Sequence, residues 1–350
     1  MKFIKPHRRT HLRTARPKPQ GVFTSRASAY RLRQFQDYLA RRRRGLRWLS
    51  QRVRRSPLAI IGLVLVLFFS FVALAAPWLA PPPSGARNPY MIPRASFRPY
   101  PEPPESAAWR SFPPDWHKHP LGLTGDQYDI YYGIIWGTRT AFRVGFEVTF
   151  SIVFVGVLLG ALAGFFGKRI DNLIMRVVDI FLSLPALIGA IVLVSFMGKG
   201  LNSVIIAFIV FGWPFYARLT RGEVLRVKEV DYVNAARASG ASNLRIIFRH
   251  ILPNAISPVV AAATLDIGSQ MVGVATLSFL GLGSPEGYAD WGQLASFARN
   301  WIVGSAGDPT QYWYVIAFPG IALLLFVLSF ALLGDAFQEI LDPRMRGEGR

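Results

Sequence analysis

The chain has 350 residues, of which 51% are hydrophobic, and its mean hydropathy is +0.29. A composition this apolar predicts an integral membrane protein. The net charge of +20 does not indicate nucleic-acid binding, because residues 1–55 hold 18 of the 40 Lys and Arg against one acid, Asp37. The absence of cysteine excludes disulfides, thiol catalysis and Cys-ligated metals.

The N-terminal region, residues 1–56, is expected to be cytoplasmic and basic. Residues 1–29 are polar and proline-rich, which is typical of disorder. From Arg31 to Arg55, apolar residues recur at steps of three and four among many arginines. This pattern predicts an amphipathic helix that binds anionic membrane lipids. A helix docked on a partner protein is the alternative.

A first transmembrane helix is predicted at 57–77, because Leu58–Ala76 is a run of 19 uncharged residues. Ala73-Leu-Ala75 resembles a signal-peptide cleavage site, but the run is longer than the apolar part of a signal, so we expect a permanent anchor. The next segment, residues 78–143, is predicted to be a stiff extracytoplasmic loop. Counted from Pro77 to residue 143, it holds 13 of the 25 prolines, and it contains no apolar run long enough to cross a bilayer.

Residues 144–343 are expected to form the core of the protein. Five further transmembrane helices are predicted at Val144–Phe166, Val177–Phe196, Val204–Ala217, Val259–Leu280 and Val315–Leu333. The predicted fold class is therefore an all-α membrane protein with six transmembrane helices. The loops Gly167–Arg176 and Arg218–His250 are rich in base and Gly283–Tyr314 is acidic, so both termini are expected in the cytoplasm.

The predicted helix Val144–Phe166 contains three glycines, Gly156, Gly160 and Gly164, which recur at every fourth residue. This spacing puts them on one helical face, where another helix can approach closely because side chains are lacking. We interpret them as packing residues.

The cytoplasmic loop 218–256 is polar and basic although it lies between apolar helices. Gly240 suits the left-handed position that ends a helix, Ser242 is a good N-cap for the next helix, and Pro253 is expected to bar its continuation. The predicted second helix places four apolar residues on one face and two bases on another, namely Leu244, Ile247, Phe248 and Ile251 opposite Arg245 and Arg249. The product would be a compact helix-turn-helix with one surface of small residues, which another protein can approach closely.

Residues 234–253 resemble the EAA loop of ABC importer permeases. Its pattern is Glu-Ala-Ala, three residues, Gly, nine residues, Ile, one residue and Leu-Pro, which this chain matches at Ala235, Ala236, Gly240, Leu252 and Pro253. Asn234 replaces the acid, and His250 stands in place of the Ile, with Ile251 beside it. The resemblance implies a site that docks on a cytoplasmic ATPase, formed by Asn234, Ala235, Ala236, Gly240, Ile251, Leu252 and Pro253. An ordinary amphipathic loop helix is the alternative.

Further short motifs, in order from His119 to Arg344, resemble the second permease subunit of the oligopeptide/dipeptide importers. They include His119-Pro-Leu-Gly122, Gly137-Thr-Arg-Thr140, Arg176-Val-Val-Asp-Ile180, Leu277-Ser-Phe-Leu-Gly-Leu-Gly283, Asp290-Trp-Gly292, Phe318-Pro-Gly320 and Leu341-Asp-Pro343. Gly122–Ile130 departs from the usual Gly-Arg-Asp element. The resemblance implies the type I ABC importer permease fold and import of dipeptides or oligopeptides across the plasma membrane by alternating access. Nickel chelates, glutathione or sugars are the alternative cargo.

The same resemblance implies the partners: a second homologous permease, two cytoplasmic ATPase subunits that hold ATP and Mg, and an extracytoplasmic substrate-binding protein. The chain itself contains neither Gly-x4-Gly-Lys-Ser/Thr nor Gly-x-Ser-x-Gly, so we expect it to have no catalytic activity and no cofactor. His117 and His119 lie close together in the outer loop, but a metal site there is the weaker interpretation.

Asp266 lies in the predicted fifth helix, where a carboxylate is costly unless it has a partner or faces water. We predict that it lines the translocation path and meets the amino end of a passing peptide. The alternative is a structural hydrogen bond or ion pair at a helix contact. A secondary transporter would need several such acids, and only Asp179, Asp266 and Glu147 are found, so that function is less favoured, as is a membrane enzyme.

Overall fold

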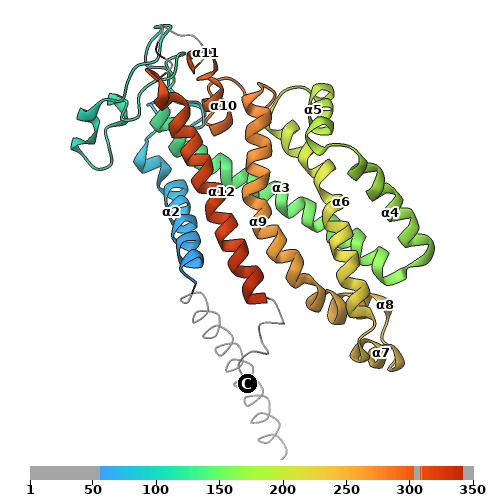
Figure 1. The fold of residues 1–350 in the computed structure, drawn as a ribbon. Coiled ribbons are helices and arrows are strands. Elements are labelled where there is room, and N and C mark those ends of the chain that lie inside the picture. The colour runs from blue at the N-terminus through green and yellow to red at the C-terminus, as the bar shows by residue number, and fades with distance from the viewer. Residues whose placement is uncertain (1–55, 303–307, 309, 342–350) are drawn as a thin grey trace, which may run out of the picture. The chain divides into compact units, whose positions relative to one another are not determined.

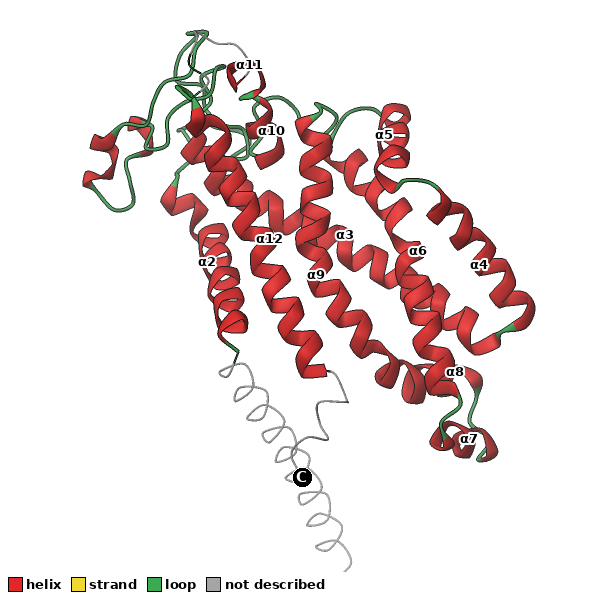
Figure 2. Ribbon diagram, in the orientation of Figure 1, coloured by secondary structure: helices red, strands yellow, loops and turns green. Residues whose placement is uncertain are grey.

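The computed structural model describes residues 56–302, 308 and 310–341. These residues are helical or in loops, apart from three isolated β-bridges (Figure 2). Five helices are long and apolar enough to cross a membrane: α2 (Pro57–Leu79), α3 (Ile130–Phe166), α6 (Leu201–Lys228), α9 (Leu252–Phe279) and α12 (Trp313–Leu341). The amphipathic helix predicted at Arg31–Arg55 lies outside the described residues.

The segment predicted as a span at Val177–Phe196 is not one continuous helix. It belongs to a bent pair, in which α4 (Lys168–Ser183) and α5 (Ala186–Met197) meet at 88° and together are apolar enough to form a broken span or a re-entrant loop. Leu184 lies between them in extended conformation, with ψ of 133°. Pro185 follows it, and a proline disfavours helical geometry in the residue that precedes it. The bend therefore has a local cause.

Helix α3 begins at Ile130, so the predicted loop boundary at residue 143 lies inside this helix. Asp129 is its N-cap, with Oδ1 accepting a hydrogen bond from the Tyr132 backbone N–H at 2.7 Å. The first turns of α3 carry buried aromatic residues, among them Tyr132 and Trp136. These residues pack against protein and not against lipid, so hydropathy alone placed the start of the helix too late.

Helices α2, α12, α9 and α6 lie side by side in that order, and α3 crosses them (Figure 1). The close contact predicted for the α3 glycines is confirmed, and it is made with α6. A Cβ atom on Gly160 would lie 2.4 Å from the Ala217 carbonyl oxygen, and one on Gly164 would lie 2.8 Å from the Val224 side chain. The two backbones are thus too close for any side chain at these positions.

Arg139 joins α2 to α3 through a carbonyl that a proline leaves free. Pro77, inside α2, has no N–H, so the Ala73 carbonyl lacks its helical partner. The Arg139 Nε donates to that carbonyl at 2.5 Å, and its guanidinium lies 5.0 Å from the Trp136 ring centroid. Arg139 therefore has a structural role in the described fold.

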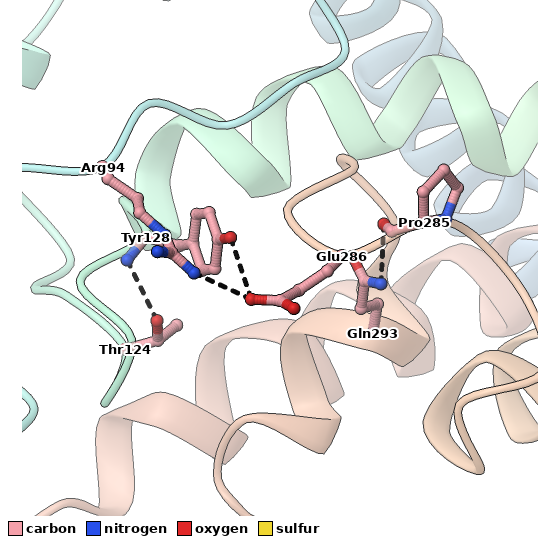
Figure 3. Close-up of polar contacts among 6 residues, drawn as sticks. All are labelled: Arg94, Thr124, Tyr128, Pro285, Glu286 and Gln293. Carbon is pink, nitrogen blue, oxygen red and sulfur yellow. Dashed lines mark hydrogen bonds and ion pairs between the residues drawn. The ribbon is translucent and has the colours of Figure 1, made fainter. Parts of the chain in front are cut away.

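At one end of the helices, the proline-rich loop is fixed to the segment that follows α9. The backbones pair at Ile92 N–H to Gly287 O, at 2.7 Å. Beside this pair, Glu286 Oε1 accepts hydrogen bonds from Arg94 Nη2 at 2.7 Å and from the Tyr128 hydroxyl at 3.2 Å (Figure 3). The loop is thus an ordered structure, which also contains the short 3-10 turns Ser106–Arg110 and Trp116–Lys118. Helices α10 (Trp291–Ser296) and α11 (Arg299–Ile302) lie at the same end (Figure 1).

Candidate functional site

The segment 231–253 forms a turn between two short helices, α7 (Asp231–Ala238) and α8 (Asn243–Ile246). Gly240 has φ of +76°, as predicted for a helix-ending glycine. Its N–H donates to Arg237 O at 3.0 Å, and the Ala241 N–H donates to Ala236 O at 3.1 Å, which together make a Schellman motif. A Cβ on Gly240 would meet nothing within 4 Å, so there is space for a side chain within this chain. Glycine is favoured here because of the left-handed backbone conformation.

The predicted helix stop at Pro253 is wrong, because α8 continues through a π-helical turn, Ile247–Ile251, into the membrane helix α9. The Leu252 N–H donates to the Ile247 carbonyl, five residues back, and this wider turn accommodates the proline. The Asn254 side-chain amide donates to the His250 carbonyl at 2.7 Å. The second helix of the turn is therefore continuous with a transmembrane helix.

A small apolar cluster anchors the segment to the ends of two long helices. Its buried members are Val233, Ile246, Ile247, Ile251 and Ala255 from the segment and α9, with Ala161 and Phe165 of α3 and Val224 and Val227 of α6. Of the four apolar residues predicted to share one face, only Ile247 and Ile251 are buried, whereas Leu244 and Phe248 are 62% and 60% exposed. The segment is thus packed on α3 and α6 and is not free to move independently of them.

Polar contacts join the same ends of α3, α4 and α6. Arg221 of α6 forms two hydrogen bonds with the Asp171 carboxylate of α4, at 2.5 and 2.6 Å. Lys228 Nζ, at the end of α6, donates to the Phe165 carbonyl of α3 at 2.7 Å. A paired, bidentate arginine fixes geometry more tightly than a single contact, so we expect α4 and α6 to move together.

Between α7 and the π-helical turn lies a hollow with a volume of about 440 Å³, which we call the coupling hollow. Its lining residues are Ala236, Ser239, Gly240, Ala241, Arg245, Arg249 and His250. One wall consists of small residues and the other is basic, and no acid lines it. This combination favours binding of an acidic protein segment.

The predicted docking residues divide into two groups. Asn234, Ala235, Gly240 and Pro253 are exposed, and Ala236 and Leu252 are half-buried. Ile251, in contrast, is fully buried in the anchoring cluster, so it supports the surface from below. The basic wall was not among the predicted docking residues, although the spacing of Arg245 and Arg249 places both on one helical face.

Asp266 lies at a contact between α9 and α6. Its Oδ2 accepts hydrogen bonds from the Tyr216 hydroxyl and from Gln270 Nε2, each at 3.0 Å. Among the described residues no Lys or Arg forms an ion pair with it. This geometry corresponds to the structural alternative, and the role in the translocation path stays a prediction.

Asp266→Asn separates these two roles, because it keeps an acceptor oxygen for Tyr216 and removes the charge. If the carboxylate meets a peptide amine, uptake of peptides with a free amino group should fall roughly tenfold, which corresponds to about 1.4 kcal/mol. Uptake of free and N-blocked peptides is compared. Tyr216→Phe is the control, since it removes the hydrogen bond and leaves the charge. An unchanged ratio of the two peptides in Asp266→Asn would assign Asp266 to the scaffold.

His119 ends the 3-10 turn Trp116–Lys118 and contacts Asp129, the N-cap residue of α3. Its Nδ1 lies 2.6 Å from Asp129 Oδ2, and this hydrogen bond raises the pKa of the imidazole. His117 stacks on Trp116, with ring centroids 3.9 Å apart. In residues 56–302 and 308–341, as far as these are described, no group of three His, Asp or Glu is placed to hold a metal ion.

Comparison with known proteins gives concordant matches. Residues 156–347 match the family model described as "Binding-protein-dependent transport system inner membrane component", and residues 48–99 match the N-terminal transmembrane domain of oligopeptide transport permease C. The dipeptide transport system permease protein DppC of Alkalihalophilus pseudofirmus is 33% identical over 85% of this chain and 89% of its own length. The glutathione transport system permease protein GsiD of Pectobacterium atrosepticum is 38% identical over 53% of this chain and 59% of its own. A solved structure of the MetNI methionine ABC transporter aligns with a TM-score of 0.49 at 22% identity, covering 60% of this chain and 97% of that one.

Proposed function

Because the chain belongs to the binding-protein-dependent transport system inner membrane components, and is therefore a multi-pass permease subunit of an ABC importer, we propose that it imports peptides, dipeptides foremost. A relative that matches over 85% of this chain is named for dipeptide transport. Glutathione, itself a peptide, is the second candidate cargo, because a relative of the core is named for it.

In the proposed mechanism, the coupling hollow receives an acidic segment of a cytoplasmic ATPase. The observation that carries this proposal is the continuity of the π-helical turn with α9, together with the packing of Ile246 and Ile251 on α3 and α6. A displacement of the segment therefore displaces three membrane helices. ATP binding by the partners can favour one state of the permease only through contacts that differ between its two states.

The assembly that we propose contains a second homologous permease, two ATPase subunits that hold ATP and Mg, and an extracytoplasmic binding protein. The excess of basic residues in the loops Gly167–Arg176 and Arg218–His250 supports a cytoplasmic position for both termini under the positive-inside rule. The Arg-rich region 31–55 would then lie near anionic lipids of the inner leaflet.

Uptake by the full complex in proteoliposomes tests the proposal. We expect accumulation of a labelled dipeptide that requires the binding protein and ATP, stops with vanadate and continues with an uncoupler. Excess unlabelled glutathione, nickel chelate or sugar is added as competitor in parallel samples. Uptake that stops with the uncoupler and continues with vanadate would indicate a secondary transporter and overturn the proposal.

A further inference from the structure

Three aromatic side chains project outward at the outer end of α2. Trp78, in the last turn of α2, is 53% exposed, and Trp109 and Phe112 of the proline-rich loop are 55% and 79% exposed. The Trp78 and Phe112 rings meet edge to face, with centroids 5.7 Å apart. We call these three residues the outer aromatic patch.

The patch is held by internal contacts, so its exposure is built into the fold. Trp109 Nε1 donates to the Pro120 carbonyl at 3.2 Å, and its ring lies against Tyr131 of α3, with centroids 6.5 Å apart. The only polar atom of this indole is therefore satisfied inside the protein. What Trp109 presents outward is apolar ring surface.

The depth of the patch follows from α2. Four exposed residues, Leu67, Phe71, Leu74 and Trp78, follow one another at steps of four and three and so share one face of the helix. This helix is long and apolar enough to cross a membrane, and it packs on α12 and α3 through other residues, so the exposed face lies against lipid. Trp78 closes the stripe at its outer end, the level at which tryptophan concentrates in membrane proteins.

Phe112 continues this lipid-facing stripe because its ring touches Trp78. The loop segment that carries it lies beside the outer end of α2 (Figure 1). Charges contribute little to its placement, since Arg110 is accompanied by Glu105 and Asp115 within the same segment. A surface with exposed aromatic rings and mixed charge suits the interface of a zwitterionic bilayer.

We propose that the outer aromatic patch inserts into the headgroup region of the leaflet at the Leu79 end of α2, so that the proline-rich loop is a membrane-bound element. The bound partner is the lipid surface itself. The loop is then fixed on one side by the bilayer and on the other by the Arg94–Glu286 contact (Figure 3).

Site-directed spin labelling tests this placement, because the native chain contains no cysteine. Ser111 is exposed between the two loop aromatics, so Ser111→Cys carries the label and leaves them intact. The full-length chain is reconstituted in phosphatidylcholine vesicles, and collisions with oxygen, which enters the membrane, are compared with collisions with a water-soluble nickel complex. Leu74→Cys, on the lipid-facing stripe, gives the value within the bilayer. Phe97→Cys is the matched control on the same loop, since that side chain is 94% exposed and has no contact with α2 among the described rings.

The expected result is a ratio of oxygen to nickel collisions at Ser111→Cys well above that of Phe97→Cys. Adding Trp109→Ala and Phe112→Ala should lower that ratio to the Phe97→Cys value. Equal ratios at both sites with the aromatics intact would overturn the proposal. So would a label that is reached by nickel in the vesicles and becomes protected only when the substrate-binding protein is added, because the patch would then be a protein-docking surface.

Discussion

Replacing Gly240 by valine is expected to abolish peptide-stimulated ATP hydrolysis in the assembled complex, while the chain still inserts in the membrane. The φ of +76° makes a β-branched residue strained by roughly 1–2 kcal/mol, a cost that the whole fold tolerates. The new side chain would meet nothing within 4 Å in this chain, so it would project into the coupling hollow. ATP hydrolysis and membrane yield are measured on the same preparations.

Gly281→Val is the matched control for the backbone strain. Gly281 ends α9 in the same motif, with φ of +80°, the Leu282 N–H donating to Leu277 O at 3.0 Å, and open space around its Cβ position. Both variants should lose the same stability, but only Gly240→Val should lose association with the ATPase. Normal stimulated hydrolysis in Gly240→Val would remove the hollow from the docking site, and loss of insertion in that variant would make Gly240 only a helix terminator.

Gly160→Leu is expected to prevent stable folding altogether. Its Cβ would lie 2.4 Å from the Ala217 carbonyl oxygen and 2.8 Å from the Thr220 Cβ, and backbone atoms of a packed helix cannot move away as a flexible side chain can. Overpacking at a tight contact costs about 3 kcal/mol or more. Membrane yield and thermal unfolding in detergent measure the loss.

Gly222→Leu, on α6, provides the comparison, because no atom lies within 4 Å of its Cβ position. Both substitutions add the same side chain inside a helix, so propensity affects them equally. Only Gly160→Leu should fail to accumulate. Equal yields of the two variants would show that α3 and α6 separate more easily than their packing indicates.

Sequence patterns correctly predicted those elements that depend only on residues adjacent in the chain. The apolar run Leu58–Ala76 predicted α2 within three residues at each end, and the glycine at 240 predicted the helix-ending turn. Each depends on residues adjacent in the chain, namely a continuous apolar run or one left-handed position.

The remaining features depend on contacts distant in sequence. Val204–Ala217 was predicted too short, because α6 continues to Lys228, where Arg221 is paired with Asp171, 50 residues away. The early start of α3 and the hydrogen bond between Asp266 and Tyr216 likewise depend on burial against another element. No pattern along the chain reports such pairs, and the basic wall of the coupling hollow likewise appears only when α7 folds beside Arg245 and Arg249.

The most direct test of the docking proposal is a photo-crosslink from Ser239, which is exposed and lines the coupling hollow. Ser239→Cys, the only cysteine in an otherwise native chain, is labelled with a short photoactivatable reagent in a complex that retains ATP-driven uptake, with labelled Phe97→Cys as the control at the opposite end of the helices. We expect an adduct between Ser239→Cys and a cytoplasmic ATPase subunit, and none from Phe97→Cys. A transport-competent complex in which Ser239→Cys forms adducts with lipid or other partners, but never with the ATPase, would contradict the docking proposal.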